Sequence, residues 1–149
     1  MSAPVGAKPV YGVDDDRPLT VVDGRCVLGR PDEIPPGSRR IFAIGGRGGV
    51  GVFNVGGRYY AVRNRCPHKG GPLCRGRLRP HVVAPAVNHY AFEREGEILK
   101  CPWHQWEFDL RSGRSLYAPH LAVQTYPVVV EDDRLVLIVE GLSTEVSVG

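Results

Sequence analysis

Two short stretches of this sequence, CPHKGGPL at residues 66–73 and CPWHQW at residues 101–106, determine the fold and the chemistry that we expect. Each stretch offers one Cys followed by one His within a loop marked by Pro or Gly: Cys66 and His68, then Cys101 and His104. Thiolates and imidazoles are the side chains that bind zinc and iron–sulfur clusters. Together the two loops predict a metal centre.

The spacing of these residues favours an iron–sulfur cluster over zinc. A zinc knuckle usually supplies two like ligands from one loop, as in Cys-x2–4-Cys. A Cys-x-His pair is cramped on a single metal, but it is natural where the Cys and the His bind different irons of a [2Fe–2S] unit. A structural Zn(Cys2His2) interaction module stays open as an alternative.

The remainder of the chain predicts an all-β fold. Its 149 residues suit one domain, and 19 Gly and 13 Pro favour short strands joined by turns. Residues 50–55 and 58–63 predict a hairpin around Gly56-Gly57, whose second strand leads toward Cys66. Residues 98–100 predict a short strand before Cys101, and residues 122–130 and 134–139 predict a closing hairpin.

Domain boundaries and compartment follow from composition. We expect a disordered N-terminal arm at residues 1–18, one domain at 19–140 and a loose tail at 141–149. The sequence has no run of 18 apolar residues, so no membrane span is expected, and the N-terminus lacks the apolar core of a secretory signal. A reducing, cytoplasmic compartment is therefore expected, with the four cysteines as ligands or free thiols.

Charge is distributed unevenly along the chain. Residues 34–92 contain no acidic side chain, and basic ones concentrate around the first loop. We expect the basic region 58–79 to dock an acidic surface of a redox partner, with a merely solvated face as the alternative. No recognition motif accompanies the charge, so nucleic acid is not expected as a partner.

The pattern Gly46-x-Gly48-x-x-Gly51 precedes a strand-like run and not a helix, so nucleotide binding is not predicted either.

The two loops resemble those of the Rieske family, in which Cys-x-His is followed by Cys-x-x-His. CPHKGGPL, and CPWHQWEFD with its following SGR, are similar to the ferredoxin and oxygenase branch. The resemblance implies an antiparallel β-sandwich with a cluster-binding subdomain built from the two loops. It also implies one [2Fe–2S] cluster, with Cys66 and Cys101 on one iron and His68 and His104 on the outer iron.

The resemblance further implies a one-electron carrier between a reductase and a terminal oxidoreductase such as an oxygenase. A Rieske subunit held within a larger oxidoreductase is the second interpretation. A self-sufficient oxygenase is not expected, because few residues follow Val139 and the catalytic domain of such enzymes is large.

The connection between the two loops is longer than is usual in the family, which predicts an insertion at about residues 78–94. A helix there would place His89 and Glu93 on one face, where a second metal could bind. We favour an extra surface hairpin or loop. Cys26 and Cys74 are expected to be buried thiols without a ligand role, and one face of the Trp103/Trp106 pair is expected to pack under the cluster.

A low reduction potential is predicted from the residues after His104. In the high-potential Rieske branch, Ser and Tyr at the second and fourth positions after this ligand donate hydrogen bonds to the cluster sulfurs; here Trp106 and Phe108 have no hydroxyl. Because such bonds stabilise the more negative reduced cluster, their loss lowers the potential. We expect a midpoint near the low end of the Rieske range, about −150 mV, by voltammetry. A value above about +100 mV would contradict this reasoning.

Overall fold

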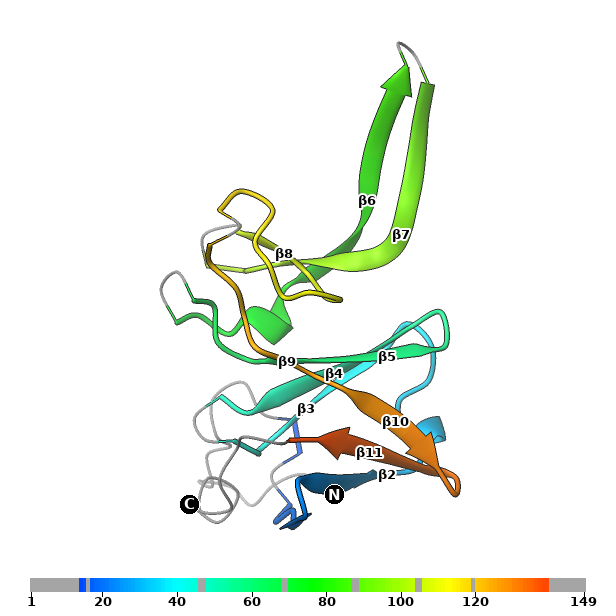
Figure 1. Cartoon of the computed structure of the whole chain (residues 1–149), viewed down its shortest axis with the longest axis vertical. Coiled ribbons are helices and arrows are strands. Elements are labelled where there is room, and N and C mark those ends of the chain that lie inside the picture. The colour runs from blue at the N-terminus through cyan, green and yellow to red at the C-terminus, as the bar shows by residue number, and fades with distance from the viewer. Residues whose placement is uncertain are drawn as a thin grey trace, which may run out of the picture.

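The computed structural model describes residues 14, 15, 17–45, 48–67, 70–86, 89–103, 106–118 and 120–139, with the backbone alone for 79–86 and 89–96. Within these residues the chain forms three antiparallel sheets and two short 3₁₀ helices, and no α-helix (Figure 1). The all-β class predicted from the sequence is confirmed.

The three sheets are each built from neighbouring antiparallel strands. The first, in the order β1-β2-β11-β10, contains Val21–Val22, Arg25–Gly29, Arg134–Ile138 and Val128–Glu131. The second, β3-β4-β5-β9, contains Arg39–Phe42, Val50–Val55, Arg58–Arg63 and Thr125–Tyr126. The third, β6-β7-β8, contains Arg77–Ala86, His89–Lys100 and Glu107–Asp109. The 3₁₀ helices η1 and η2 are Pro31–Glu33 and Leu73–Arg75.

The second sheet is buried on both of its faces. Successive side chains of a strand point to opposite faces, and here both sets are apolar. Phe42 and Val52 belong to the core shared with the first sheet, whereas Ile41 and Phe53 belong to the core shared with the third sheet and the two Cys loops. The first two sheets thus form a sandwich, and the third sheet with its loops packs on the opposite side.

The hairpin of β4 and β5 forms as predicted. Val50 pairs with Arg63 and Val55 with Arg58, and the two connecting residues Gly56 and Gly57 have positive φ of 61° and 94°. Glycine adopts this conformation without steric cost, and such a turn matches the twist of the flanking strands. Strand β5 therefore ends at a fixed place, three residues before Cys66.

The insertion is a long hairpin of β6 and β7 that extends beyond the rest of the molecule (Figure 1). This confirms the expected hairpin, and the helix that would have paired His89 with Glu93 is wrong, because both lie in strand β7. The register shifts twice in this hairpin, and each shifted interval contains one of the prolines, Pro80 or Pro85. A proline has no N–H to donate to the ladder, so irregular pairing is expected there.

The edge of β3 is covered by residues that the sequence analysis assigned to the N-terminal arm. Asp14 donates its N–H to the Ile41 carbonyl at 2.8 Å and accepts the Ile41 N–H on Oδ2 at 2.9 Å, and Asp15 forms a bridge with Phe42. Residues 14, 15, 17 and 18 thus belong to the described part of the chain. The remaining domain limits stay predictions, because 1–13 and 140–149 lie outside the described residues. Among the described residues, no helix has the length and apolar character to cross a membrane.

Candidate metal centre

The first Cys loop is closed at its neck by the backbone of Cys66. Its N–H donates to the Gly71 carbonyl at 2.8 Å, and its carbonyl accepts the Gly70 N–H at 2.7 Å. Gly70 has φ of +80°, a conformation that favours glycine. The chain then enters η2, whose Leu73 is buried. These bonds fix the Cys66 side chain at the base of a short, tight loop.

Asn64 anchors this loop to the second sheet. The side chain is 3% exposed; its Nδ2 donates to the Gly48 carbonyl at 2.9 Å, and its Oδ1 accepts the Cys74 N–H at 2.8 Å. One amide thus connects the turn before β4 to the end of the loop. Asn64 was not predicted from the sequence, although an Asn between a strand and a ligand loop is typical of a residue that hydrogen-bonds nearby backbone.

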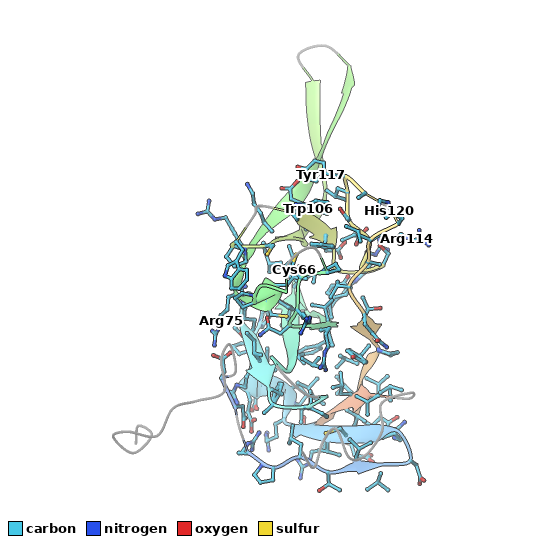
Figure 2. The ribbon with its side chains drawn as sticks, turned by 90° about the vertical axis from the view of Figure 1, so that its left-hand side faces the viewer. Cys66, Arg75, Trp106, Arg114, Tyr117 and His120 are labelled. Atoms are coloured by element: carbon cyan, nitrogen blue, oxygen red, sulfur yellow. The ribbon has the colours of Figure 1, made fainter. Side chains whose placement is uncertain are left out.

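The second Cys loop has the same construction. It connects β7 to β8, and the N–H of Cys101 donates to the Trp106 carbonyl at 2.7 Å. Cys66 and Cys101 are 1% and 0% exposed and belong to one hydrophobic core. Figure 2 shows Cys66 inside the molecule below Trp106, with Arg75 to one side. The structure therefore brings together the two cysteines that the sequence selected.

The two loops touch through Gly71 and Trp103. A Cβ placed on Gly71 would lie 2.7 Å from Cδ2 of the Trp103 indole, so a larger residue does not fit without movement. Trp103 is 51% exposed and covers this glycine, while Trp106 packs against the core that contains both cysteines. Trp106 therefore packs beside the two cysteines, and the expectation that one face of the Trp pair packs under the cluster stays a prediction.

The residues present fit a site for a metal–sulfur group. The four cysteines, all within the described chain, form no disulfide, and two of them lie at the necks of adjoining loops. His68 and His104 lie outside the described residues, as do Lys69 and Gln105. The predicted assignment of the two histidines as ligands therefore stays a prediction.

The other two cysteines are packing residues, as expected. Burial raises the pKa of the Cys26 thiol to about 11 and that of the Cys74 thiol to about 12, so both stay protonated at neutral pH. Cys74 shares the core of Cys66 and Cys101, and its Sγ is 3.5 Å from the Val62 carbonyl. A Cβ on Gly51 would collide with this sulfur, so β4 needs glycine at that position.

Two buried carboxylates, which the sequence analysis missed, tie the third sheet to its neighbours. Glu97 of β7 is 5% exposed and accepts a hydrogen bond from the Tyr60 hydroxyl; burial and this bond raise the pKa of Tyr60. Glu107 of β8 is 4% exposed and accepts a hydrogen bond from the Tyr117 hydroxyl at 2.6 Å. Both acids flank the second loop, so each helps to hold the strand that positions it.

Comparison with known proteins agrees with this site. The family model described as Rieske [2Fe-2S] domain matches residues 24–127. The ferredoxin component of the 2,4-dinitrotoluene dioxygenase system of Burkholderia sp. (strain RASC) is 31% identical over 107 residues, covering 71% of this chain and 86% of the relative. The ferredoxin component of the naphthalene 1,2-dioxygenase/salicylate 5-hydroxylase systems of Ralstonia sp. is 29% identical over 120 residues, covering 80% and 95%.

Solved structures share the fold. The Sphingomonas yanoikuyae B1 ferredoxin superposes with a TM-score of 0.55 at 23% identity, covering 75% of this chain and 95% of the other. A chain from the complex of reduced oxygenase and oxidized ferredoxin in carbazole 1,9a-dioxygenase superposes with a TM-score of 0.61 at 19% identity, covering 80% of this chain and 96% of the other.

By the match of the family model and of the ferredoxin relatives, this protein belongs to the Rieske [2Fe–2S] domain family. The predicted Rieske fold, [2Fe–2S] cofactor and ferredoxin-type electron-transfer class are thereby confirmed.

The contact between Gly71 and Trp103 predicts that a substitution at Gly71 affects both the stability of the fold and the retention of the cluster. In Gly71→Ala the new methyl group overlaps the indole, so we expect the loops to separate, the free energy of unfolding to fall by about 1–3 kcal/mol and the cluster to be lost faster to a chelator. Urea unfolding and visible absorbance measure the two effects.

The double variant Gly71→Ala/Trp103→Ala is the control, since it removes the atoms that clash. Its cluster retention should exceed that of Gly71→Ala alone. If Gly71→Ala retains its cluster as the unaltered protein does, the two loops do not depend on this contact.

Proposed function

We propose that this chain is the ferredoxin component of an oxygenase system, accepting one electron from a reductase and passing it to a terminal oxygenase. The observation that carries this proposal is the pairing of Cys66 and Cys101 in one buried core, each at the neck of a short loop. The relatives that match over most of their length are ferredoxin components of dioxygenase systems, which supports the same role.

For the ligands, we propose that Cys66 and Cys101 hold one iron and that His68 and His104 hold the other. The cluster, when bound, supplies the one-electron oxidation and reduction. The chain contributes two thiolates in an apolar core, where water is excluded from the sulfur side. Each His follows its Cys within the same loop, which suits binding to a neighbouring iron.

A pair of histidine variants tests this ligand set. His104→Ala should remove the mixed His/Cys character of the cluster, abolishing the reduced-state EPR signal typical of it and lowering the iron content. His120→Ala is the matched control, because His120 is an exposed histidine in a turn that belongs to neither Cys loop. Equal spectra for the two variants would exclude His104 as a ligand.

For docking, we propose that an acidic surface of the partner meets the basic region 58–79. Two of its exposed side chains, Arg65 and Arg75, flank the first loop. Clustered positive charge steers an acidic partner and raises its association rate. We propose the cytoplasm as the compartment, which agrees with four cysteines that form no disulfide.

Reconstituted electron transfer tests the function. With the reductase and oxygenase of a dioxygenase system, the cluster-loaded protein should be reduced and then reoxidised by the oxygenase, as measured by stopped-flow absorbance. Arg65→Gln should slow association up to roughly ten-fold at low salt, and the difference should shrink as ionic strength rises. Arg134→Gln, on the exposed start of β11, is the control. Reduction by a reductase without reoxidation by any oxygenase tested would contradict the proposal.

A further inference from the structure

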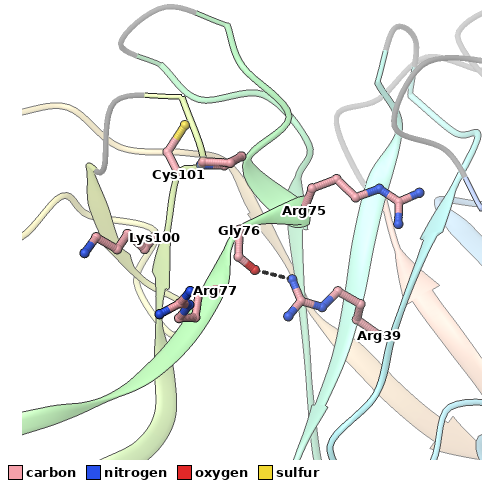
Figure 3. A pocket seen from close by; sticks show the side chains of 7 residues that line it. Arg39, Arg75, Gly76, Arg77, Lys100 and Cys101 are labelled. Atoms are coloured by element: carbon pink, nitrogen blue, oxygen red, sulfur yellow. Dashed lines mark hydrogen bonds between the residues drawn. The ribbon is translucent and has the colours of Figure 1, made fainter.

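A pocket of about 510 Å³ lies beside the second Cys loop, between β3, η2 and the base of the β6–β7 hairpin (Figure 3). It is lined by four cationic side chains and by the adjoining backbone: Arg39, Arg75, Gly76, Arg77, Lys100, Cys101 and Pro102. No described acidic residue lines it. Its volume falls within the roughly 300–1,000 Å³ typical of small-molecule sites.

Arg39 is the fixed member of the lining. One nitrogen of its guanidinium, Nη1, donates to the Cys74 carbonyl at 2.8 Å and to the Gly76 carbonyl, and the group lies 5.1 Å from the centroid of the Phe53 ring. Burial lowers the pKa of Arg39 from its ordinary value, but an arginine still keeps its charge in proteins. These bonds hold a permanent cation at one wall of the pocket.

Two further cations of the lining stand at the start of the hairpin. Arg77 and Lys100 are paired residues in the register of β6 and β7. Gly76 permits this arrangement, because a Cβ there would collide with the Lys100 carbonyl. The backbone of the third sheet therefore presents Arg77 and Lys100 side by side at the mouth of the pocket, next to Cys101.

The positive charge of the pocket is balanced only in part within the described chain. Arg75 pairs with Asp14 at 2.5 Å. No described carboxylate forms an ion pair with Arg39, Arg77 or Lys100. Like charges gathered in a concave site raise the local concentration of anions. Arginine forks match the oxygens of phosphate and carboxylate groups, often by two parallel hydrogen bonds.

We propose that this pocket binds a small polyanion carrying at least two phosphate or carboxylate groups, and that binding lowers the reduction potential of the cluster. The second part rests on the proposed ligand role of Cys101, which lines the same pocket. A reduced cluster carries one more negative charge, so a neighbouring anion binds it more weakly than the oxidised form. By linkage, tenfold weaker binding to the reduced form corresponds to a midpoint lower by about 59 mV for one electron.

Calorimetry on the oxidised, cluster-loaded protein tests binding without any redox partner. Pyrophosphate and citrate, titrated separately at constant ionic strength, represent the phosphate and carboxylate sources. We expect one site per chain for at least one of them. Arg77→Gln and Lys100→Gln should each weaken it about tenfold or more, consistent with the loss of a charge-assisted bond. Arg39 is left unchanged, because its backbone hydrogen bonds support the fold.

Arg134→Gln is the matched control, since it removes the same charge from an exposed site in another sheet. Equal weakening by Arg134→Gln would mean that the anions respond only to overall charge, which would overturn the proposal. Absence of binding by both probes would overturn it as well. If Arg77→Gln left the affinity for both anions unchanged and weakened only the association with an acidic partner protein, the pocket would be part of the docking surface and the proposal would be overturned.

Voltammetry with and without the anion, at a concentration near its dissociation constant for the unaltered oxidised protein, tests the redox part. We expect a lower midpoint in the unaltered protein and a much smaller shift in Arg77→Gln at the same anion concentration. Binding without a shift in midpoint would overturn the coupling to the cluster. Because these readouts need neither reductase nor oxygenase, their failure leaves the proposed electron transfer intact, and a failure of electron transfer leaves them intact.

Discussion

The site depends on the close approach of two loops that are far apart in the sequence. Gly71 of the first loop lies against the Trp103 indole of the second, and this contact is possible only because glycine has no side chain. Each loop is also closed at its own neck by the N–H of its cysteine, at 2.8 Å for Cys66 and 2.7 Å for Cys101. The cysteines are thus positioned by backbone bonds within each loop, and the contact of Gly71 with Trp103 helps to position the loops against each other.

The sheets behind the loops provide the rigid support for this arrangement. The β3-β4-β5-β9 sheet is apolar on both faces, so one face completes the sandwich and the other packs beneath the cysteines. Burial of apolar area is the main favourable contribution to such packing. Asn64, Glu97 and Glu107 add buried hydrogen bonds that would be costly to leave unsatisfied.

Local pattern predicted much of this structure. The β4–β5 hairpin follows from two glycines between β-branched and aromatic runs, and the two Cys loops follow from their Pro and Gly residues. Contacts between distant parts of the chain could not be found in this way. Arg39 donates a hydrogen bond to Gly76, Tyr60 donates one to Glu97, and Asp14 covers the edge of β3 only once the sheets are assembled. The prolines of the insertion left helix and strand undecided, because pairing with a second strand settles that choice.

The central claim is that the chain binds one [2Fe–2S] cluster between these loops. The most direct measurement is the content of iron, acid-labile sulfide and zinc in the purified protein, together with its visible spectrum. The account predicts about two irons and two sulfides per chain in a brown protein. A colourless protein with one zinc and no sulfide would contradict it.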